Sequence, residues 1–368
     1  MRAQVSRGWL LCLAWGIAGL HAVSAAAADE LHWYRGNTHT HTRNSDGKWT
    51  PDAVVRWYRE HRYQFLFITD HEYVTDPAPL NAMFGASERF LLLPGQEITQ
   101  WSRDPSRQSA HVNSLFTTKV IWPIGERSCL GGGCGAHVDP TVALSETFKT
   151  NIAAVRAARG IAQINHPNFM WSVKPEDLYE VPDGCLIEVW NGGEVNNLGG
   201  TNDSGDARPS AEGYWDILLS RGKVMWGVAS DDSHSYSDVD GAGDAGHGWI
   251  MVHAPELSSD AIKAALAQGR FYASTGVTLD GITAGPTELS FTIVEMQKER
   301  DRYLTRFIGQ DGNVLAEVPG THPTYTIKGN EHYVRASVMD SNGERAWTQP
   351  VFTDGRSRAR DKMTRASD

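Results

Sequence analysis

Phe65-Leu66-Phe67-Ile68-Thr69-Asp70-His71 joins an apolar run of strand length to a carboxylate and an imidazole. The same arrangement recurs along the chain, where short apolar runs end in polar side chains. The further runs cover 90–93, which precedes Gln96-Glu97; 161–164, which precedes Asn165-His166; 186–190, which precedes Asn191; and 224–229, which precedes Ser230-Asp231-Asp232-Ser233-His234. Because continuous apolar character is typical of strands buried on both faces, these runs predict a largely parallel sheet.

Helical patterns alternate with these runs. One begins at Thr50-Pro51, where an N-cap residue precedes a first-turn proline, and others cover 146–159, 212–220 and 258–268. Alternating strands and helices predict an α/β barrel, in which catalytic residues collect at the C-terminal ends of the strands. His111 does not follow this rule, because it precedes its own predicted strand at 112–116.

The pattern changes near residue 285. Segments 289–293 and 333–338 alternate apolar and polar side chains, and turn signals such as Asp340-Ser341-Asn342-Gly343 follow them. We therefore expect a barrel domain over 29–284 and a small antiparallel β domain over 285–354. The basic and polar tail at 355–368 is expected to be disordered.

The first 28 residues have the composition of a signal peptide. Arg2 and Arg7 precede an apolar stretch over 9–20, and the alanines at 25–28 provide small residues for cleavage. The apolar stretch is short for a membrane span, so cleavage near Ala28 is expected rather than anchoring. We expect the mature chain in the periplasm or outside the cell, without stable membrane insertion.

The composition is that of a globular protein, since 40% of the 368 residues are hydrophobic and 21% are charged. The net charge of −10 disfavours nucleic acid as a partner, because proteins that bind a phosphate backbone usually carry a basic face. A small-molecule partner is expected instead. Nothing in the sequence indicates an oligomeric state.

Three cysteines follow the predicted cleavage site, in a compartment where disulfides form. Cys129 and Cys134 flank a glycine-rich turn that lets them close a short loop, so a disulfide is favoured. Two free thiols or two metal ligands are the alternative. Cys185 begins an apolar run and is expected to be a buried free thiol.

His39-Thr40-His41 places two imidazoles on the same side of an extended segment, where both can bind one metal ion. The alternative is a pair of solvent-facing histidines at a strand edge. Asp46 follows in a turn that can fold its carboxylate back towards them. Asp70-His71 and Asp232-Ser233-His234 add further pairs of carboxylate and imidazole at strand ends, and Asp231 is expected to support the second pair.

Short motifs rich in histidine and carboxylate follow one another along the chain. They are Asn37-Thr38-His39-Thr40-His41-Thr42, Ser45-Asp46-Gly47, Ile68-Thr69-Asp70-His71, Gly95-Gln96-Glu97, His111-Val112-Asn113, Asn165-His166-Pro167 and Ser230-Asp231-Asp232-Ser233-His234. In this order they resemble the PHP (polymerase and histidinol phosphatase) superfamily, and 269–276 looks like a late segment of its stand-alone bacterial members. The resemblance covers roughly residues 33 to 280 and implies an α/β fold, a distorted (β/α)7 barrel.

The resemblance also implies three divalent metal ions, with Mn, Zn or Fe as candidates. The first ion would be held by His39, His41, Glu97 and Asp232, the second by Glu97, His111 and His166, and the third by Asp46, His71 and His234. Asp46 stands where some relatives have histidine, so the third site is expected to differ in metal preference. His111, which the strand-end rule leaves out, is a ligand in this scheme.

The function implied by the resemblance is that of an exported phosphoesterase for phosphate mono- or diesters of small organic molecules. A hydroxide that bridges two metal ions would attack the ester, and the ions would neutralise charge on the phosphoryl oxygens. Hydrolysis of a carboxylic ester, carbamate or amide is an alternative, because the same nucleophile attacks carbonyl groups. A second alternative is a non-catalytic secreted protein that binds metal or carbohydrate.

A few residues are expected to act in catalysis or substrate binding. Glu97 would bridge two ions, and Asp70 would orient a ligand rather than bind metal itself. Asn191, at a strand end, is a candidate for substrate binding, although a turn-forming asparagine explains it equally well. His247 is a candidate for binding phosphate and protonating the leaving group, with an ordinary surface histidine as the alternative.

Overall fold

The computed structural model describes residues 1, 30–85, 89–101, 109–130, 133–137, 139, 141–203, 205–237, 244–295 and 302–354. Apart from Met1, the predicted signal peptide lies outside these residues, and so does the predicted disordered tail at 355–368. Leu31–Asp368 forms one unit. No helix within the described ranges is long and apolar enough to cross a bilayer.

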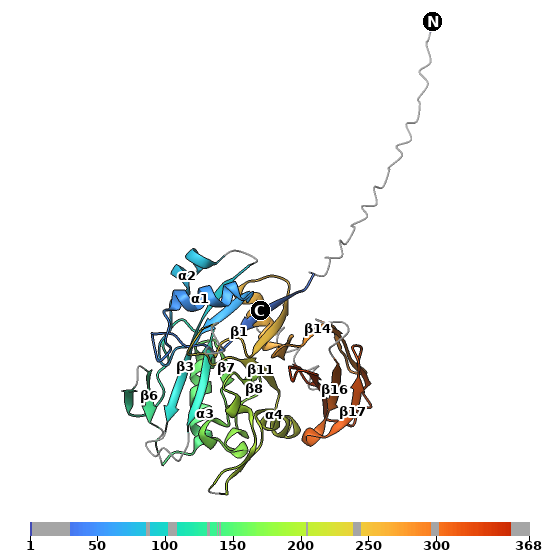
Figure 1. Ribbon diagram of the computed structural model, residues 1–368. Coiled ribbons are helices and arrows are strands. Elements are labelled where there is room, and N and C mark those ends of the chain that lie inside the picture. The colour runs from blue at the N-terminus through green and yellow to red at the C-terminus, as the bar shows by residue number, and fades with distance from the viewer. Residues whose placement is uncertain are drawn as a thin grey trace. The chain divides into compact units, whose positions relative to one another are not determined.

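One large sheet contains the strands that the apolar runs predict (Figure 1). Its first part has the order β11 (Met225–Ser230), β8 (Cys185–Asn191), β7 (Ile161–Ile164), β4 (Ala110–Leu115), β3 (Leu91–Trp101), β2 (Phe65–Ile68), β1 (His32–Asn37), β12 (Trp249–Ala254) and β13 (Phe271–Ser274). Strands β7, β8 and β11 pair in parallel, as do β1, β2 and β3. Strands β2, β7 and β11 are buried along their whole length, which explains their continuous apolar sequences.

Strand β4 runs antiparallel to both of its neighbours, β3 and β7, so the expectation of a parallel sheet is wrong at this point. The segment between β3 and β4 is too short for the crossover of about a dozen residues that parallel pairing needs. The reversal puts the start of β4 at the edge where the neighbouring strands end, with His111 opposite Thr99. The strand-end rule therefore includes His111 once the direction of its strand is known.

The described helices are α1 (Pro51–Glu60), α2 (Pro77–Phe84), α3 (Leu144–Ala157), α4 (Ala211–Ser220) and α5 (Ser259–Ala267), with 3-10 turns η1 (Phe169–Trp171), η2 (Pro175–Leu178), η3 (Glu194–Asn197) and η4 (Gln310–Gly312). Pro51 occupies the first turn of α1 as predicted, whereas the Thr50 side chain makes no capping hydrogen bond. Ser210 and Ser258 do cap α4 and α5 through their side chains. The sequence does not predict α2, because none of its residues is buried and no apolar stripe forms.

Beyond β13 the large sheet continues through β20 (Arg345–Thr348), β19 (Tyr333–Asp340), β16 (Tyr303–Ile308) and β17 (Val314–Pro319), and β21 (Val351–Phe352) pairs with β19. A separate sheet contains β14 (Thr278–Ala284), β15 (Glu288–Val294) and β18 (Thr324–Thr326). These late strands, orange to red in Figure 1, pair antiparallel and enclose an apolar cluster that includes Phe291 and Phe307. The predicted domain boundary at residue 285 stays a prediction. Strand β14 lies before this residue but pairs with β15, which follows it, and β13 pairs with β20, so the sheets cross the predicted boundary.

The fold class is mixed α/β, as predicted. Closure into a (β/α)7 barrel stays a prediction, since no ladder among the described strands joins β11 to β12. Two small hairpins lie outside the main strand order, one of β5 (Arg127–Leu130) and β6 (Gly133–His137), the other of β9 (Gly200–Thr201) and β10 (Ala207–Arg208). Cys129 and Cys134 form the predicted disulfide between β5 and β6, and Cys185 is free and buried, as predicted.

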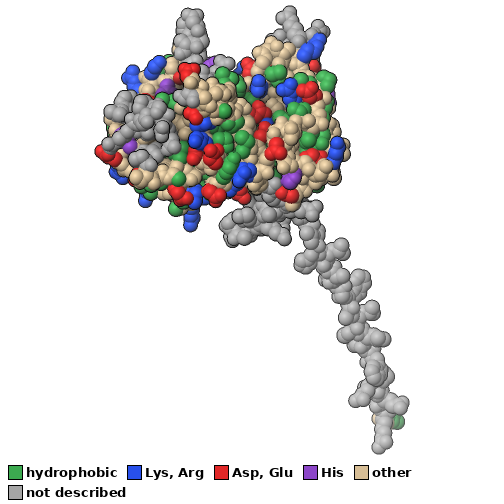
Figure 2. Space-filling model, turned by 90° about the horizontal axis from the view of Figure 1, so that it is seen from below, with side chains coloured by type: hydrophobic (Ala, Val, Ile, Leu, Met, Phe, Trp, Pro, Cys, Tyr) green, Lys and Arg blue, Asp and Glu red, His purple; other side chains and the backbone are tan. Residues whose placement is uncertain are grey.

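Figure 2 shows one face of the molecule, on which acidic and basic side chains are interspersed. Among the residues that the structure describes, five charged side chains differ from this surface pattern because they are at most 1% exposed. They are Asp70, Glu97, Glu188, Asp231 and Arg335. A buried charge is unfavourable unless it has partners, so each of them marks a place where the fold assembles a polar group. The four acidic residues belong to the candidate site described below.

Candidate metal centre

The candidate site lies where β1, β2, β3, β7 and β11 end. After β1 the chain continues through 39–41, between the segments that follow β2 and β11. Thr69 N donates a hydrogen bond to Thr40 O at 2.9 Å, and His41 N donates to Ser233 O at 2.9 Å. These main-chain bonds hold the two predicted histidine ligands beside the ends of both strands.

The nine predicted metal ligands come together, although they lie far apart in the sequence. They form four overlapping groups whose ligand atoms lie within 4.8 Å of one another: His41, Asp46, His71 and His234; His39, His41 and Glu97; His39, His166 and Asp232; and Glu97, His111 and His166. Groups of three or four imidazole and carboxylate atoms suit divalent ions such as Zn, Mn or Fe.

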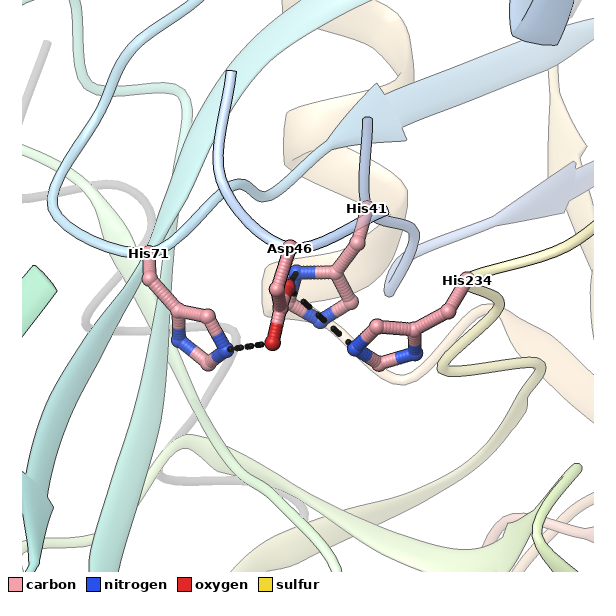
Figure 3. A group of neighbouring side chains, drawn as sticks. All are labelled: His41, Asp46, His71 and His234. Carbon is pink, nitrogen blue, oxygen red and sulfur yellow. Dashed lines mark ion pairs between the residues drawn. The ribbon is translucent and has the colours of Figure 1, made fainter. Parts of the chain in front are cut away.

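Asp46 lies between the three histidines of the group in Figure 3. Its Oδ2 lies 3.3 Å from His71 Nε2, and its Oδ1 lies 3.3 Å from His234 Nε2. The same Oδ1 lies 3.6 Å from His41 Nδ1. The turn after the histidine pair therefore brings its carboxylate back to them, as predicted. The fold also adds His41 to this group, which the sequence-based assignment leaves out.

Glu97 faces most of the remaining ligands with its two carboxylate oxygens. Oε2 lies 3.3 Å from His39 Nε2 and 3.3 Å from His41 Nε2. Oε1 lies 2.8 Å from His111 Nδ1 and 3.6 Å from His166 Nε2. One side chain thus contacts two different sets of histidines, which is the arrangement that a bridging carboxylate needs.

Four of the candidate ligand histidines also have a partner for their second ring nitrogen. The pairs are His39 Nδ1 with Glu188 Oε1 (2.7 Å), His71 Nδ1 with Thr99 Oγ1 (2.6 Å), His111 Nε2 with Ser109 Oγ (2.5 Å) and His234 Nδ1 with Asp232 O (2.9 Å). Partners of this kind fix the orientation and the tautomer of a ring, so that its other nitrogen presents a lone pair to an ion. The candidate ligands and the residues that hold them in position therefore both fit a metal site.

Glu188, on β8, is buried completely, and the sequence motifs do not include it. Besides the bond from His39, it accepts hydrogen bonds from Ser230 Oγ at 2.5 Å and from His166 N at 2.6 Å. It therefore connects β8 and β11 to two of the candidate ligands. A signal was present in the sequence, because a lone acidic residue inside an apolar strand needs a buried partner.

Asp70, the predicted supporting residue, is buried completely. Its Oδ1 accepts hydrogen bonds from Thr42 N at 2.6 Å and from Ser45 Oγ at 2.7 Å. Both donors belong to the segment that carries Asp46. Asp70 thus stabilises the position of a candidate ligand and is absent from the four ligand groups.

Asp231 stabilises the segment that carries His247. Its Oδ1 accepts hydrogen bonds from His247 N at 2.8 Å and from Gly248 N at 2.9 Å, and its Oδ2 accepts one from Tyr58 OH at 2.7 Å. The His247 side chain is exposed and belongs to none of the four ligand groups. Its roles as phosphate contact and proton donor stay predictions.

Asn191, at the end of β8, is buried, and its side-chain amide is engaged within the protein. Nδ2 donates a hydrogen bond to Glu188 Oε2 at 3.0 Å and lies 3.3 Å from Asp232 Oδ2. Oδ1 accepts a bond from Gly193 N at 2.9 Å. The residue therefore supports two acidic side chains of the site, and a contact with substrate stays a prediction.

Electrostatics within the cluster raise the pKa of three imidazoles, those of His39, His41 and His166, because neighbouring carboxylates outweigh the effect of burial. Burial lowers the pKa of His41, but hydrogen bonds with Asp232 and Glu97 outweigh it and raise this pKa to about 10. Burial would raise the pKa of Glu97, yet the surrounding histidines hold it well below its usual range. A divalent ion would supply the same positive charge and release protons on binding.

No protein-family model matches the chain, and no curated protein matches it. Among solved structures, the chain is similar to a two-domain protein from Bacteroides vulgatus that contains a predicted PHP-like metal-dependent phosphoesterase, with 16% identity, a TM-score of 0.45, and coverage of 84% of this chain and 90% of that chain. It is also similar to a protein from Bifidobacterium adolescentis described as a metal-dependent phosphoesterase (16% identity, TM-score 0.36, 63% and 95% covered). A third likeness is to an amidohydrolase from Chromobacterium violaceum (13% identity, TM-score 0.33, 56% and 90% covered).

Proposed function

We propose that this chain is an exported, metal-dependent hydrolase of the PHP type that cleaves phosphate mono- or diesters of small organic molecules. The observation that carries the proposal is the convergence of the nine predicted ligands, together with the buried partners of their outer ring nitrogens. Solvent-facing histidines at a strand edge, the alternative account of the His39 and His41 pair, do not fit, because both side chains are buried completely.

Three divalent ions, with Mn, Zn and Fe as candidates, are the proposed cofactors. His39, His41, Glu97 and Asp232 would hold the first, Glu97, His111 and His166 the second, and Asp46, His71 and His234 the third, with His41 beside this last set. When bound, such ions activate water for attack and neutralise charge on the phosphoryl oxygens. Three or four protein atoms per ion leave positions for water and substrate.

The chain's own residues would supply orientation and proton transfer. Glu97 joins two ligand sets through its two oxygens, and Asp70 holds the segment that carries Asp46. His247 is the proposed contact for the phosphate and proton donor to the leaving group. Its support is an exposed imidazole on a segment that Asp231 anchors through the backbone.

The strands around the site are proposed to close into the distorted (β/α)7 barrel. The mature protein would act in the periplasm or outside the cell, on a small-molecule phosphate ester rather than on nucleic acid or a membrane. The composition of the first 28 residues supports export, and the net charge of −10 supports the choice of a small molecule over nucleic acid.

Activity profiling of the metal-loaded mature protein tests the proposal. We expect metal-dependent turnover of nitrophenyl phosphate or bis-nitrophenyl phosphate, with a metal content that matches the proposed sites by elemental analysis. Turnover of nitrophenyl acetate without either phosphate ester would favour a carboxylic ester, carbamate or amide hydrolase. Full metal content without turnover of any ester would favour a binding protein.

A further inference from the structure

An aromatic ring bounds the candidate site at His111 and His166. The ring centroid of Phe169 lies 5.1 Å from that of His166 and 5.8 Å from that of His111. Phe169 is half-buried beside these two imidazoles. The opposite end of the cluster has polar exposed groups instead, because the side chains of Asp46 and His234 are 31% and 33% exposed. The two ends of the site therefore differ in polarity.

The turn that carries Phe169 has an unusual backbone. Met170 has a φ of 52° and Trp171 a φ of 57°, in the left-handed region that residues other than glycine rarely adopt. Ser172 N donates a hydrogen bond to Phe169 O at 3.1 Å, and Trp171 Nε1 donates to Asp206 O at 2.9 Å. Strained backbone that long-range contacts maintain is typical of ligand sites. Here it leaves the Met170 side chain 59% exposed.

A second loop brings another exposed apolar residue to this turn through its backbone. Asn168 is buried, and its Nδ2 donates hydrogen bonds to Leu198 O at 2.9 Å and to Pro209 O at 2.6 Å. Leu198 is 56% exposed. Asn168 therefore joins the loop around Leu198 to the turn that carries Phe169 and Met170.

We infer that Phe169, Met170 and Leu198 form an apolar wall for the organic group of the substrate, so that esters with an aryl or longer alkyl group are preferred to small or polar ones. This inference rests on the proposed function. An ester whose reacting group lies at His111 and His166 has the Phe169 ring beside it. Apolar surface of the substrate that contacts the wall leaves water, which favours binding.

Binding of phosphonates to the metal-loaded protein separates the wall from catalysis. Ethylphosphonate and hexylphosphonate carry the same anionic group and differ in alkyl length. Hexylphosphonate should bind at least about 10-fold more tightly by calorimetry, because additional methylenes reach the wall. Phe169→Ala should remove most of this difference, and Leu198→Ala should reduce it. Met83→Ala, which truncates a methionine of α2 that is 67% exposed, is the matched control and should leave the difference unchanged.

Hydrolysis of ethyl and hexyl phosphate gives a second readout, since their leaving groups have similar basicity and the same preference is expected in kcat/KM. Two results would contradict the inference about the wall and leave the proposed function in place. They are equal affinity for the two phosphonates, and an unchanged preference in Phe169→Ala and Leu198→Ala at normal metal content. A preference for hexylphosphonate without turnover of any ester would contradict the proposed function and support the wall. Failure of both phosphonates to bind would contradict both.

Discussion

An imidazole that binds a metal ion uses one ring nitrogen, and its other nitrogen needs a partner of its own. The spacing of His39 and His41 in the sequence indicates the first requirement, a ring nitrogen that can bind the ion. The second is met by residues such as Glu188, which lies 149 positions away from His39 in the sequence. A spacing motif cannot include such a partner, because only the fold brings the two side chains together.

Substitution of Glu188 by Gln tests this second requirement. Glu188→Gln keeps the size of the side chain and removes the negative charge that His39 Nδ1 faces at 2.7 Å. We expect metal affinity, measured by competition with a chelator, to fall by roughly 10–100-fold. Glu317→Gln, which changes a carboxylate that is 51% exposed, should leave the affinity unchanged. Equal affinities of Glu188→Gln and the wild type would contradict the role assigned to Glu188.

Glu97→Ala tests the shared ligand of two proposed sites. Because Glu97 faces five histidines with its two oxygens, we expect its loss to abolish metal loading and turnover together. Elemental analysis and a phosphate ester assay on the same sample measure both. Glu146→Ala, at a side chain of α3 that is 55% exposed, is the control. A metal-replete and fully active Glu97→Ala protein would refute the site.

At the scale of whole elements, apolar runs indicate where strands lie, and they do not indicate which way the strands run. The run at 112–116 predicts β4, and only its pairing with β3 and β7 shows that it is reversed. Helix α2 shows the converse limit, since an element without buried residues leaves no periodic pattern in the sequence.

Helix α4 is joined to β19 by a buried ion cluster. Arg335 Nη2 lies 2.6 Å from Asp216 Oδ2, and Arg335 Nη1 lies 2.8 Å from Glu212 Oε1. Arg335→Met would remove the cation that faces Asp216 and leave Glu212 with Arg345, whose Nη1 lies 3.9 Å from Glu212 Oε2. We therefore expect a loss of about 3–5 kcal/mol in the free energy of unfolding by urea. Arg306→Met, at an exposed ion pair with Glu317, should cost at most about 1 kcal/mol. Similar losses of unfolding free energy in Arg335→Met and Arg306→Met would show that burial does not increase the stabilisation by the Arg335 cluster.

The same cluster predicts a pH dependence of stability. Burial would raise the pKa of Glu212, but Arg335 outweighs burial and lowers it below the usual range. A lowered pKa in the folded state means that Glu212 stabilises the fold above its unfolded pKa of about 4.3 and loses this effect as the pH falls through the folded value. Glu212→Gln should therefore be less stable than the wild type at pH 7, and the difference should vanish in acid. A difference that does not change with pH would contradict the ionic role of Glu212.

At the scale of the whole molecule, the predicted export would decide where the proposed hydrolase meets its substrate. When the full chain is produced in a Gram-negative host, we expect it in the periplasm with an N-terminus near Asp29, because 1–28 has the charge, apolar stretch and small residues of a cleaved signal. Fractionation and N-terminal sequencing measure this outcome. A chain that starts at Asp29 after an initiator Met should stay in the cytoplasm. Full-length protein in the cytoplasm would contradict the signal peptide.

The chemistry of the site was readable in the sequence. Short motifs of imidazole and carboxylate side chains, in the order from His39 to His234, indicated all nine candidate ligands through their resemblance to a known family, whereas the strand-end pattern alone left out His111. The burial of most strands could also be predicted from the sequence, because a continuous apolar run indicates a strand that is buried on both faces.

Long-range packing set what no local pattern contains. The reversal of β4 brought His111 to the site, and Glu188 became the partner of His39. Each of these depends on contacts between segments far apart in the chain. These contacts form only when the strands have paired, so the spacing of residues along the sequence does not predict them.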